Sequence, residues 1–208
     1  MRKIVLATTN PGKIREIEEI LADAPCEIMR AERYFPLPHI DENGRTFFEN
    51  ALKKAKIYAR HTGETVLADD SGLEVDFLQG SPGVYSARYA GIGATDEANL
   101  SKLLREMERA ASSERNAVFR CVLVLCSPDG DHRAFEGRWA GQISEVARGT
   151  GGFGYDPVFF LPELGRTVAE LTPEDKNRRS HRAQALHRLK EYLIQNGRVG
   201  LNFGQNGA

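Results

Sequence analysis

The chain has 208 residues, of which 41% are hydrophobic and 27% are charged, which is typical of a globular protein with one large domain or two joined lobes. Lys and Arg number 28 against 29 for Asp and Glu, so the formal net charge is −1. Because phosphate neutralisation drives the binding of DNA and RNA, this balance argues against a nucleic-acid polymer as the partner and leaves room for a small anion.

The cysteines and the lengths of the apolar runs indicate where in the cell the protein is expected. Cys26, Cys121 and Cys126 form no C-x-x-C pair, which argues against a zinc site and favours buried thiols in a reducing compartment. No apolar run approaches the roughly 20 residues of a membrane helix, and the run near the N-terminus is too short for a signal peptide. We therefore expect a cytoplasmic protein that does not engage a membrane.

The first elements alternate between strand and helix. Residues 3–7 predict a short buried strand, and apolar residues from Ile14 to Leu21 recur at helical spacing after the turn TTNPGK. Residues 26–30 predict a second strand, and the segment PLPHIDENG predicts a loop because it holds two prolines and a glycine.

The next helix has a clear beginning and end. Thr46 and Glu49 fit a capping box, an apolar face runs from Phe47 to Tyr58, and Gly63 fits a helix end. The same helix carries basic residues that we expect on a solvated face, namely Lys53, Lys56 and Arg60.

The middle of the chain predicts a mixed sheet. Residues 65–69 predict a strand ending in charge, residues 96–109 a helix and residues 117–126 a long strand. The turn PDGD makes residues 132–139 the returning arm of a hairpin, which argues against an all-parallel sheet. An α/β fold around a mixed sheet follows.

The last third predicts a loop, a short strand and two helix starts. The loop GTGGFGYDP leads into VFF, and Pro173 suits the first position of a helix that begins after Thr172. A final helix is expected from about residue 180 to 195. We expect a single domain over residues 1–197 and a poorly ordered tail over 198–208.

The turn TTNPGK, residues 8–13, is a candidate polyphosphate site. N–H groups at a helix start favour anions, Lys13 adds a positive charge, and Thr8 and Asn10 can donate hydrogen bonds. It is not a Walker A motif, and an ordinary strand-to-helix turn explains it about as well.

The segment ADDSG places two carboxylates side by side, which is costly without a compensating positive charge. Mg²⁺ binds through one or two carboxylates together with substrate phosphates. Asp69 and Asp70 point in opposite directions in an extended chain, so only one should reach a given metal. Asp41 or Glu42, ahead of a helix, could supply a second carboxylate. Solvated aspartates in a capped turn, and a helix-dipole role for Asp41 and Glu42, explain the pattern about as well.

The loop GTGGFGYDP matches G-x-G-x-x-G, but Pro157 and a strand follow it, whereas a dinucleotide site needs a helix there. Phe153 and Tyr155 could instead stack on a nucleobase beside Asp156. The alternative is a glycine-rich turn with aromatic residues in the core.

The segment KNRRSHR is rich in donors for base carbonyls or phosphates, namely Lys176, Ser180, His181 and Arg182. The alternative, a basic first turn of the final helix, is weakened because cations are disfavoured at a helix N-terminus. Neither a nucleophile elbow nor an H-E-x-x-H motif is present in the sequence, so no machinery for covalent catalysis is visible.

Together, TTNPGK, ADDSGL, FGYDP and SHR occur in the order found in the inosine/xanthosine triphosphate pyrophosphatases, and the chain resembles bacterial members of that family from Lys3 to the last helix. GVYSARYAG and GTGGFGYDP are also similar to the bacterial sequences. The resemblance implies an elongated mixed sheet with surrounding helices, two lobes and a central cleft. It also implies a homodimer, Mg²⁺, and hydrolysis of ITP, dITP and XTP to the monophosphate and pyrophosphate.

The resemblance further implies roles for single residues. Glu42 and Asp70 would bind the metal, and Asp70 would accept a proton. Asn43 is a small departure from the family's usual pattern. Substrate contacts are implied for Thr8, Thr9, Asn10, Pro11, Gly12, Lys13, Ser71, Phe153, Gly154, Tyr155, Asp156, Lys176, His181 and Arg182. A non-catalytic nucleotide sensor and a pyrophosphatase for dUTP or another modified nucleotide remain the alternatives.

Overall fold

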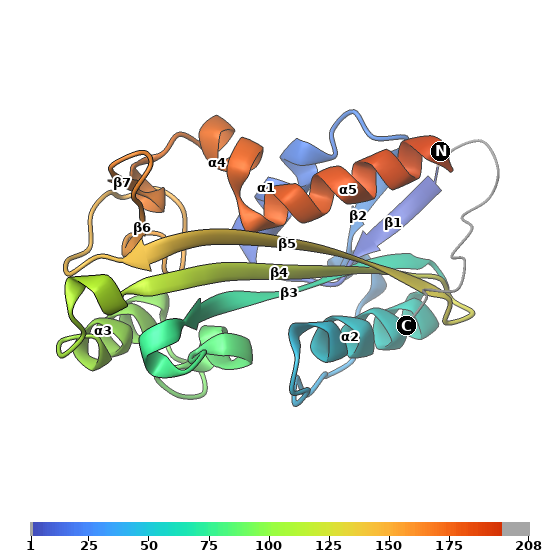
Figure 1. Cartoon of the computed structure of the whole chain (residues 1–208). Helices are drawn as coiled ribbons and strands as arrows, with labels where there is room; N and C mark the ends of the chain where they lie inside the picture. The colour runs from blue at the N-terminus through green and yellow to red at the C-terminus, as the bar shows by residue number, and fades with distance from the viewer. Residues whose placement is uncertain (1, 197–208) are drawn as a thin grey trace. The chain divides into compact units, whose positions relative to one another are not determined.

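A computed structural model describes residues 2–196. Within this range the strands form a mixed sheet in the order β2-β1-β3-β4-β5-β6-β7 (Figure 1). β1 (Arg2–Leu6) pairs in parallel with β2 (Cys26–Arg30) and with β3 (Thr65–Val75). The parallel connections confirm the predicted alternation of strands and helices at the start of the chain.

The connections between the other strands differ in length: β4–β5 and β6–β7 are joined by short turns, and the longer segment 144–158 joins β5 to β6. β4 (Asn116–Cys126) leads into β5 (His132–Ile143) through a turn in which the Ser127 N–H donates to the Asp131 carbonyl at 2.9 Å. β6 (Phe159–Leu161) pairs antiparallel with β5 and with β7 (Arg166–Thr167). The sheet is therefore mixed, as predicted.

The described residues divide into two compact units. The first holds residues 2–70, 121–137 and 182–196, and the second holds residues 71–120 and 138–181. β3, β4 and β5 each contribute residues to both units, so neither unit is one continuous stretch of chain.

In the first unit, helices cover both faces of the sheet. α1 (Pro11–Ile20) and α5 (His181–Gln195) lie on one face, and α2 (Phe47–Thr62) lies on the other (Figure 1). Ile17 and Leu189 pack with Leu6 in one buried cluster under α1 and α5. Leu67 of β3 belongs to this cluster, and since side chains alternate along a strand, its neighbours Val66 and Ala68 face the opposite side of the sheet.

Local signals set the ends of α2. Thr46 caps the helix by accepting the Glu49 N–H at 3.1 Å, and Gly63 ends it with φ +69°. The predicted capping box forms only in part, because the Glu49 carboxylate accepts the N–H of Arg45 at 2.7 Å.

The second unit has its own core. Leu103 of α3 (Asp96–Glu106) packs with Phe119, Phe159 and Leu73, and the rings of Phe119 and Phe159 stack with centroids 4.2 Å apart. Leu73 and Val75 join this core, so β3 continues beyond the charged pair and the predicted end at residue 69 is wrong. Burial of the later residues outweighs the local signal of adjacent carboxylates.

α4 (Pro173–Arg179) is a separate helix ahead of α5, with Thr172 capping its start as predicted. Lys176 and Arg179 lie in the last turn of α4, where cations suit the negative helix end. The basic segment is therefore mainly the end of one helix rather than the first turn of the next.

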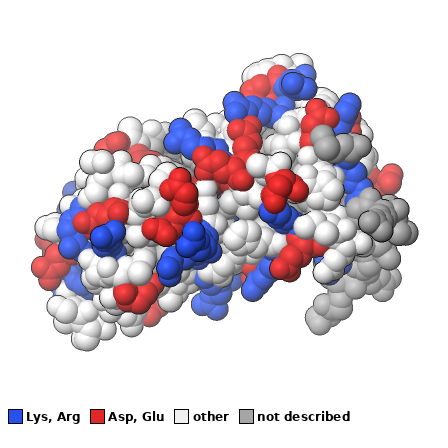
Figure 2. All heavy atoms as spheres, turned by 90° about the horizontal axis from the view of Figure 1, so that it is seen from above, with Lys and Arg blue, Asp and Glu red and all other residues white. Residues whose placement is uncertain are grey.

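The predictions about membrane helices, cysteines, surface charge and the C-terminal tail can be compared with the structure. No described helix is long and apolar enough to cross a membrane, and the three cysteines are buried without disulfides. On the face seen in Figure 2, Lys and Arg side chains are interspersed with Asp and Glu. The predicted tail over 198–208 lies outside the described residues.

Candidate functional site

The adjacent carboxylates of Asp69 and Asp70 face opposite sides of β3. Asp69 continues the row of Leu67, which belongs to the cluster under α1 and α5, and its partners come from those two helices. Asp70 is also influenced by the charge of Lys13, but the side chain that acts on it as a hydrogen-bond donor is Asn50 of α2, and Lys54 of the same helix adds a second positive charge. The prediction that the two point in opposite directions is confirmed.

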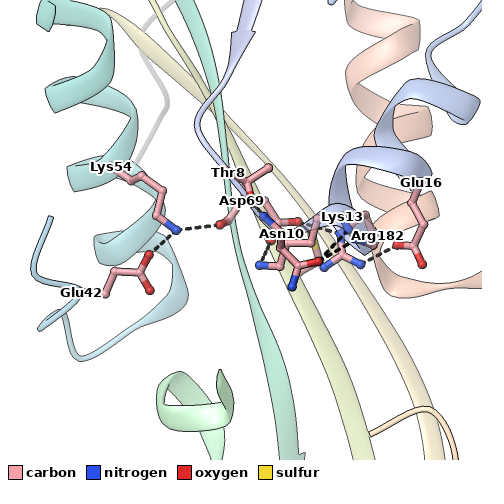
Figure 3. Close-up of polar contacts among 10 residues, drawn as sticks. Thr8, Asn10, Lys13, Glu16, Glu42, Lys54, Asp69 and Arg182 are labelled. Carbon is pink, nitrogen blue, oxygen red and sulfur yellow. Dashed lines mark hydrogen bonds and ion pairs between the residues drawn. The ribbon is translucent and has the colours of Figure 1, made fainter. Parts of the chain in front are cut away.

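Asp69 lies at the centre of a buried ion network (Figure 3). One carboxylate oxygen pairs with the ammonium group of Lys13, and the other accepts from Nε of Arg182 at 2.8 Å and from the Cys121 thiol at 3.4 Å. Nη1 of Arg182 also contacts the Glu16 carboxylate at 2.6 Å. Burial alone would raise the pKa of Asp69, but the charges of Arg182 and Lys13 hold it well below its usual value.

Asp70 has the opposite electrostatic character. It is 6% exposed, and burial raises its pKa to about 6 despite the opposing charges of Lys13 and Lys54. The nearby Glu42 carboxylate contributes to this rise. Oδ2 of Asp70 is buried and has no hydrogen-bond partner among the described residues. A desolvated carboxylate beside a second carboxylate is suited to a cation or a proton.

Lys54 is a site residue that the sequence reasoning missed. Its ammonium group pairs with Glu42 and donates to the backbone carbonyl of Asp69 at 3.1 Å (Figure 3). Asn50 and Lys54 are four residues apart and therefore lie on the same side of α2, each next to an apolar position. Polar residues at the edge of a buried helix face were the sequence signal that could have identified them as site residues.

The loop that carries Glu42 is tied to α2. Lys53 donates to the Asp41 carbonyl at 2.7 Å and to Oδ1 of Asn43 at 2.9 Å. Asn50 accepts the N–H of Gly44 through Oδ1 at 2.7 Å. Lys53 was expected only to be solvated, and its position opposite this loop gives it a definite role.

Fewer backbone N–H groups at the start of α1 are available to bind an anion than the sequence suggested. Oδ1 of Asn10 accepts the N–H groups of Gly12 and Lys13 at 2.9 and 3.1 Å, and Pro11 has no N–H. Thr8 accepts the N–H of Asn10 at 3.2 Å, and Thr9 is exposed beside it. The ammonium group of Lys13 is thus the main cationic donor at this helix start.

The carboxylates of Glu42 and Asp70 fit a metal ion whose remaining ligands come from substrate phosphates. Glu42 and Asp70 lie close enough to influence each other, and Oδ2 of Asp70 is unsatisfied. Among the described residues, no group of three or more His, Cys, Asp or Glu could hold a metal. This arrangement suits Mg²⁺, which takes one or two carboxylates plus substrate phosphates.

The second unit gathers three of the predicted base-site residues. Asp156, 3% exposed, accepts from the ammonium group of Lys176 at 2.5 Å and from the N–H of Phe153 at 2.9 Å. That ammonium group also lies 4.6 Å from the centre of the Phe153 ring. All three residues were among the predicted base-site residues, although Lys176 lies 20 positions from Asp156 in the sequence.

The other predicted base-site residues have mainly structural contacts. Tyr155 is buried and its hydroxyl donates to the Ser86 carbonyl at 2.9 Å, while the N–H of Gly154 donates to Asp96 at 2.8 Å. The ring of His181 stacks on Phe119 with centroids 4.7 Å apart. Ser71 follows Asp70 on β3 and is half-buried.

Arg182 is the residue whose placement differs most from the expectation. Expected to line a base pocket, it is 2% exposed, and its guanidinium contacts Asp69 and Glu16 of the first unit. Sequence proximity to His181 suggested a shared role, but the side chain contributes to the ion network.

Comparisons with known proteins agree on one family. The Ham1 family model matches residues 4–192. A protein of Geobacter sulfurreducens named dITP/XTP pyrophosphatase is 53% identical over 193 residues, covering 93% of this chain and 97% of its own. A Bacillus licheniformis protein of the same name is 47% identical, covering 94% and 100%. The structure of a HAM1 protein from Coxiella burnetii superposes with a TM-score of 0.86 at 43% identity, covering 94% and 100%.

Proposed function

Because this chain belongs to the Ham1 family, we propose that it hydrolyses deaminated purine nucleoside triphosphates (ITP, dITP and XTP) to the monophosphate and pyrophosphate. The reaction would remove these nucleotides from the cellular pool. The relatives' names support this substrate class, and the residues of the first unit support the chemistry.

The observation that carries the proposal is the buried carboxylate of Asp70. It has an unsatisfied oxygen, a pKa of about 6, and the carboxylate of Glu42 and the ammonium group of Lys54 nearby. A general base works best when its pKa is near the working pH, and an ordinary aspartate is too acidic. A solvated structural aspartate would have neither the raised pKa nor the orphaned oxygen.

We assign Glu42 and Asp70 as the residues that would hold Mg²⁺. When bound there, the metal would neutralise phosphate charge and lower the pKa of a bound water. The unsatisfied Oδ2 of Asp70 and the carboxylate pair support the assignment.

The chain's own residues would then divide the work of hydrolysis. Asp70 accepts a proton from the attacking water, whose oxygen bonds to phosphorus as the bond to the leaving pyrophosphate breaks. Lys13 and Lys54 stabilise the negative charge on the phosphates. Asp69 does not bind metal in this scheme, because Lys13 and Arg182 already neutralise it.

Base selection is assigned to Phe153, Asp156, Lys176 and His181. Hypoxanthine and xanthine carry an acceptor oxygen at position 6, where adenine carries an amino donor. Donors such as Lys176 that face adenine would remain unpaired, at a cost of about 1–3 kcal/mol each. Two such mismatches give roughly 10³-fold discrimination.

The homodimer and the cytoplasmic location stay predictions based on the resemblance and on the cysteines. Analytical ultracentrifugation of the purified protein tests the first, and fractionation of cells that express a tagged chain tests the second.

Pyrophosphate release from ITP, dITP, XTP, ATP, GTP and dUTP, measured with Mg²⁺ and with EDTA, tests the proposed function. We expect Mg²⁺-dependent release confined to the first three. Release from none of them would favour a nucleotide-binding protein without catalysis. A preference for ATP or dUTP would keep the chemistry and overturn the base assignment.

A further inference from the structure

Asn50 stands out among the buried polar residues of the described chain. It is 1% exposed and lies in the first turn of α2, and Nδ2 has no partner within hydrogen-bond distance among the described residues although Oδ1 is hydrogen-bonded. A buried donor without a partner is rare in a native protein and calls for an explanation.

The orientation of the amide is fixed from one side. Oδ1 accepts the N–H of Gly44 at 2.7 Å, and a Cβ on Gly44 would lie 2.6 Å from that oxygen, so loop and helix are in close contact. The hydrogen bond defines which end of the amide is oxygen, because only an acceptor can meet an N–H. Nδ2 must therefore point away from the loop.

The second side of the amide faces the candidate base. Burial raises the pKa of Asp70, and a side-chain hydrogen-bonding interaction from Asn50 opposes that rise, which places the Asn50 amide beside the carboxyl. Nδ2 of Asn50 and Oδ2 of Asp70 are both buried without hydrogen-bond partners among the described residues. The amide therefore acts on the carboxyl as a hydrogen-bond donor, but the contact is longer than an ordinary hydrogen bond, since neither atom has a described partner within that distance. Catalytic contacts of this kind often tighten when a ligand binds.

We propose that Asn50 is a positioning residue of the candidate site: Oδ1 holds the loop that carries Glu42, and Nδ2 orients the carboxylate of Asp70. One amide would then fix the two carboxylates relative to each other. The inference deepens the proposed function and rests on it.

Asn99 provides a matched control. It is also buried in a helix, and its Oδ1 accepts a backbone N–H, that of Ala90, at 2.7 Å. Its Nδ2, however, donates to the Ala87 carbonyl at 3.3 Å, so both ends serve the backbone. A structural asparagine and a positioning asparagine can therefore be compared in one protein.

The test uses Asn50→Ala, Asn50→Asp and Asn99→Ala in the full chain. Asn50→Ala removes both interactions, whereas Asn50→Asp keeps an acceptor for Gly44 and replaces the donor with a carboxyl group, which also adds negative charge beside Asp70. We expect kcat for ITP to fall about 10–100-fold in both Asn50 variants, with a much smaller change in KM. Asn99→Ala should lower the melting temperature and leave kcat unchanged.

Binding of Mn²⁺ alone, followed by the paramagnetic resonance signal of the free ion, gives a readout without turnover. We expect Asn50→Ala to weaken Mn²⁺ binding about tenfold and Asn99→Ala to leave it unchanged. Full kcat in folded Asn50→Asp, or unchanged Mn²⁺ affinity in Asn50→Ala, would overturn the inference. Asn50-dependent Mn²⁺ binding in a wild-type protein that hydrolyses no ITP would instead sink the proposed function and keep the role of Asn50.

Discussion

Asp69 and Asp70 are neighbours on β3, yet their pKa values move in opposite directions. Alternation along the strand gives Asp69 the cations of α1 and α5, and gives Asp70 a desolvated position near Glu42. Two neighbouring carboxyl groups whose pKa values differ in this way can take two roles. One stays ionised and structural, and the other can exchange a proton near neutral pH.

Asp70→Asn should abolish pyrophosphate release from ITP, by at least about 10²-fold, because the amide cannot accept a proton from water. The fold should be unchanged in circular dichroism. Near-normal turnover by the folded variant would remove Asp70 from the mechanism.

The same substitution should make the metal-free protein more stable, in a manner that depends on pH. The pKa of Asp70 lies near 6 in the folded state and near 3.8 in the unfolded chain, so the folded state binds the proton more tightly. The wild type therefore loses stability as the pH rises from about 4 through 6. The advantage of Asp70→Asn should grow from near zero at pH 4 to at most roughly 3 kcal/mol at pH 8. Urea unfolding in EDTA measures it, and an advantage that shrinks as pH rises would contradict the assignment.

Asp69→Asn should have the opposite effect on stability. It leaves Arg182 and Lys13 with less compensation in a buried network, at a cost of about 3–5 kcal/mol in unfolding free energy. Asp23→Asn is the control, since Asp23 pairs with Lys190 on the surface and its loss should change little. Equal urea midpoints for the two variants would show that the network contributes no stability.

Lys54→Met should lower kcat for ITP about 10²-fold, because it removes a cation that pairs with Glu42 and reaches the backbone of Asp69. Lys56→Met on the same helix is the control and should keep kcat within about twofold. Steady-state kinetics at saturating Mg²⁺ distinguish the two, and equal losses would mean that the helix tolerates no change of charge.

Gly152→Ala should disrupt the group formed by Asp156 and Lys176. Gly152 has φ +73°, and a Cβ would lie 1.9 Å from Oδ2 of Asp156. Gly165→Ala is the control, because Gly165 has φ +63° with open space around it. That variant should show only the backbone cost of a left-handed residue, about 1–2 kcal/mol of unfolding free energy. Thermal melts and KM for ITP check the pair: only Gly152→Ala should raise KM, and a similar rise in Gly165→Ala would count against the base assignment.

The sequence was sufficient for features with a local cause. The cap at Thr46, the end at Gly63 and the turn before β5 each depend on residues a few positions apart, and all were predicted. The continuation of β3 to Val75 depends on burial against distant elements, so the local charge pattern was misleading.

The ion network shows the same limit within the site. Asp69 and Arg182 are 113 positions apart, and Glu16 and Arg182 are 166 apart, so no spacing along the chain links them. Motif order identified the residues, whereas their partners depend on how the sheet brings α1 and α5 together. Lys54 and Asn50 were missed because each residue of this helix was assigned either to an apolar face or to a solvated face, and none to a site.

The late position of α5 has a consequence for synthesis. The first unit includes residues 2–70, but its core also includes Leu186, Leu189 and Leu193, and its buried Asp69 is neutralised by Arg182. On the ribosome, the strands within residues 2–70 are made well before these residues. Their apolar face stays uncovered, and Asp69 lacks its main counter-ion, until the chain has emerged beyond Leu193. The first unit therefore cannot complete its core before α5 has been made.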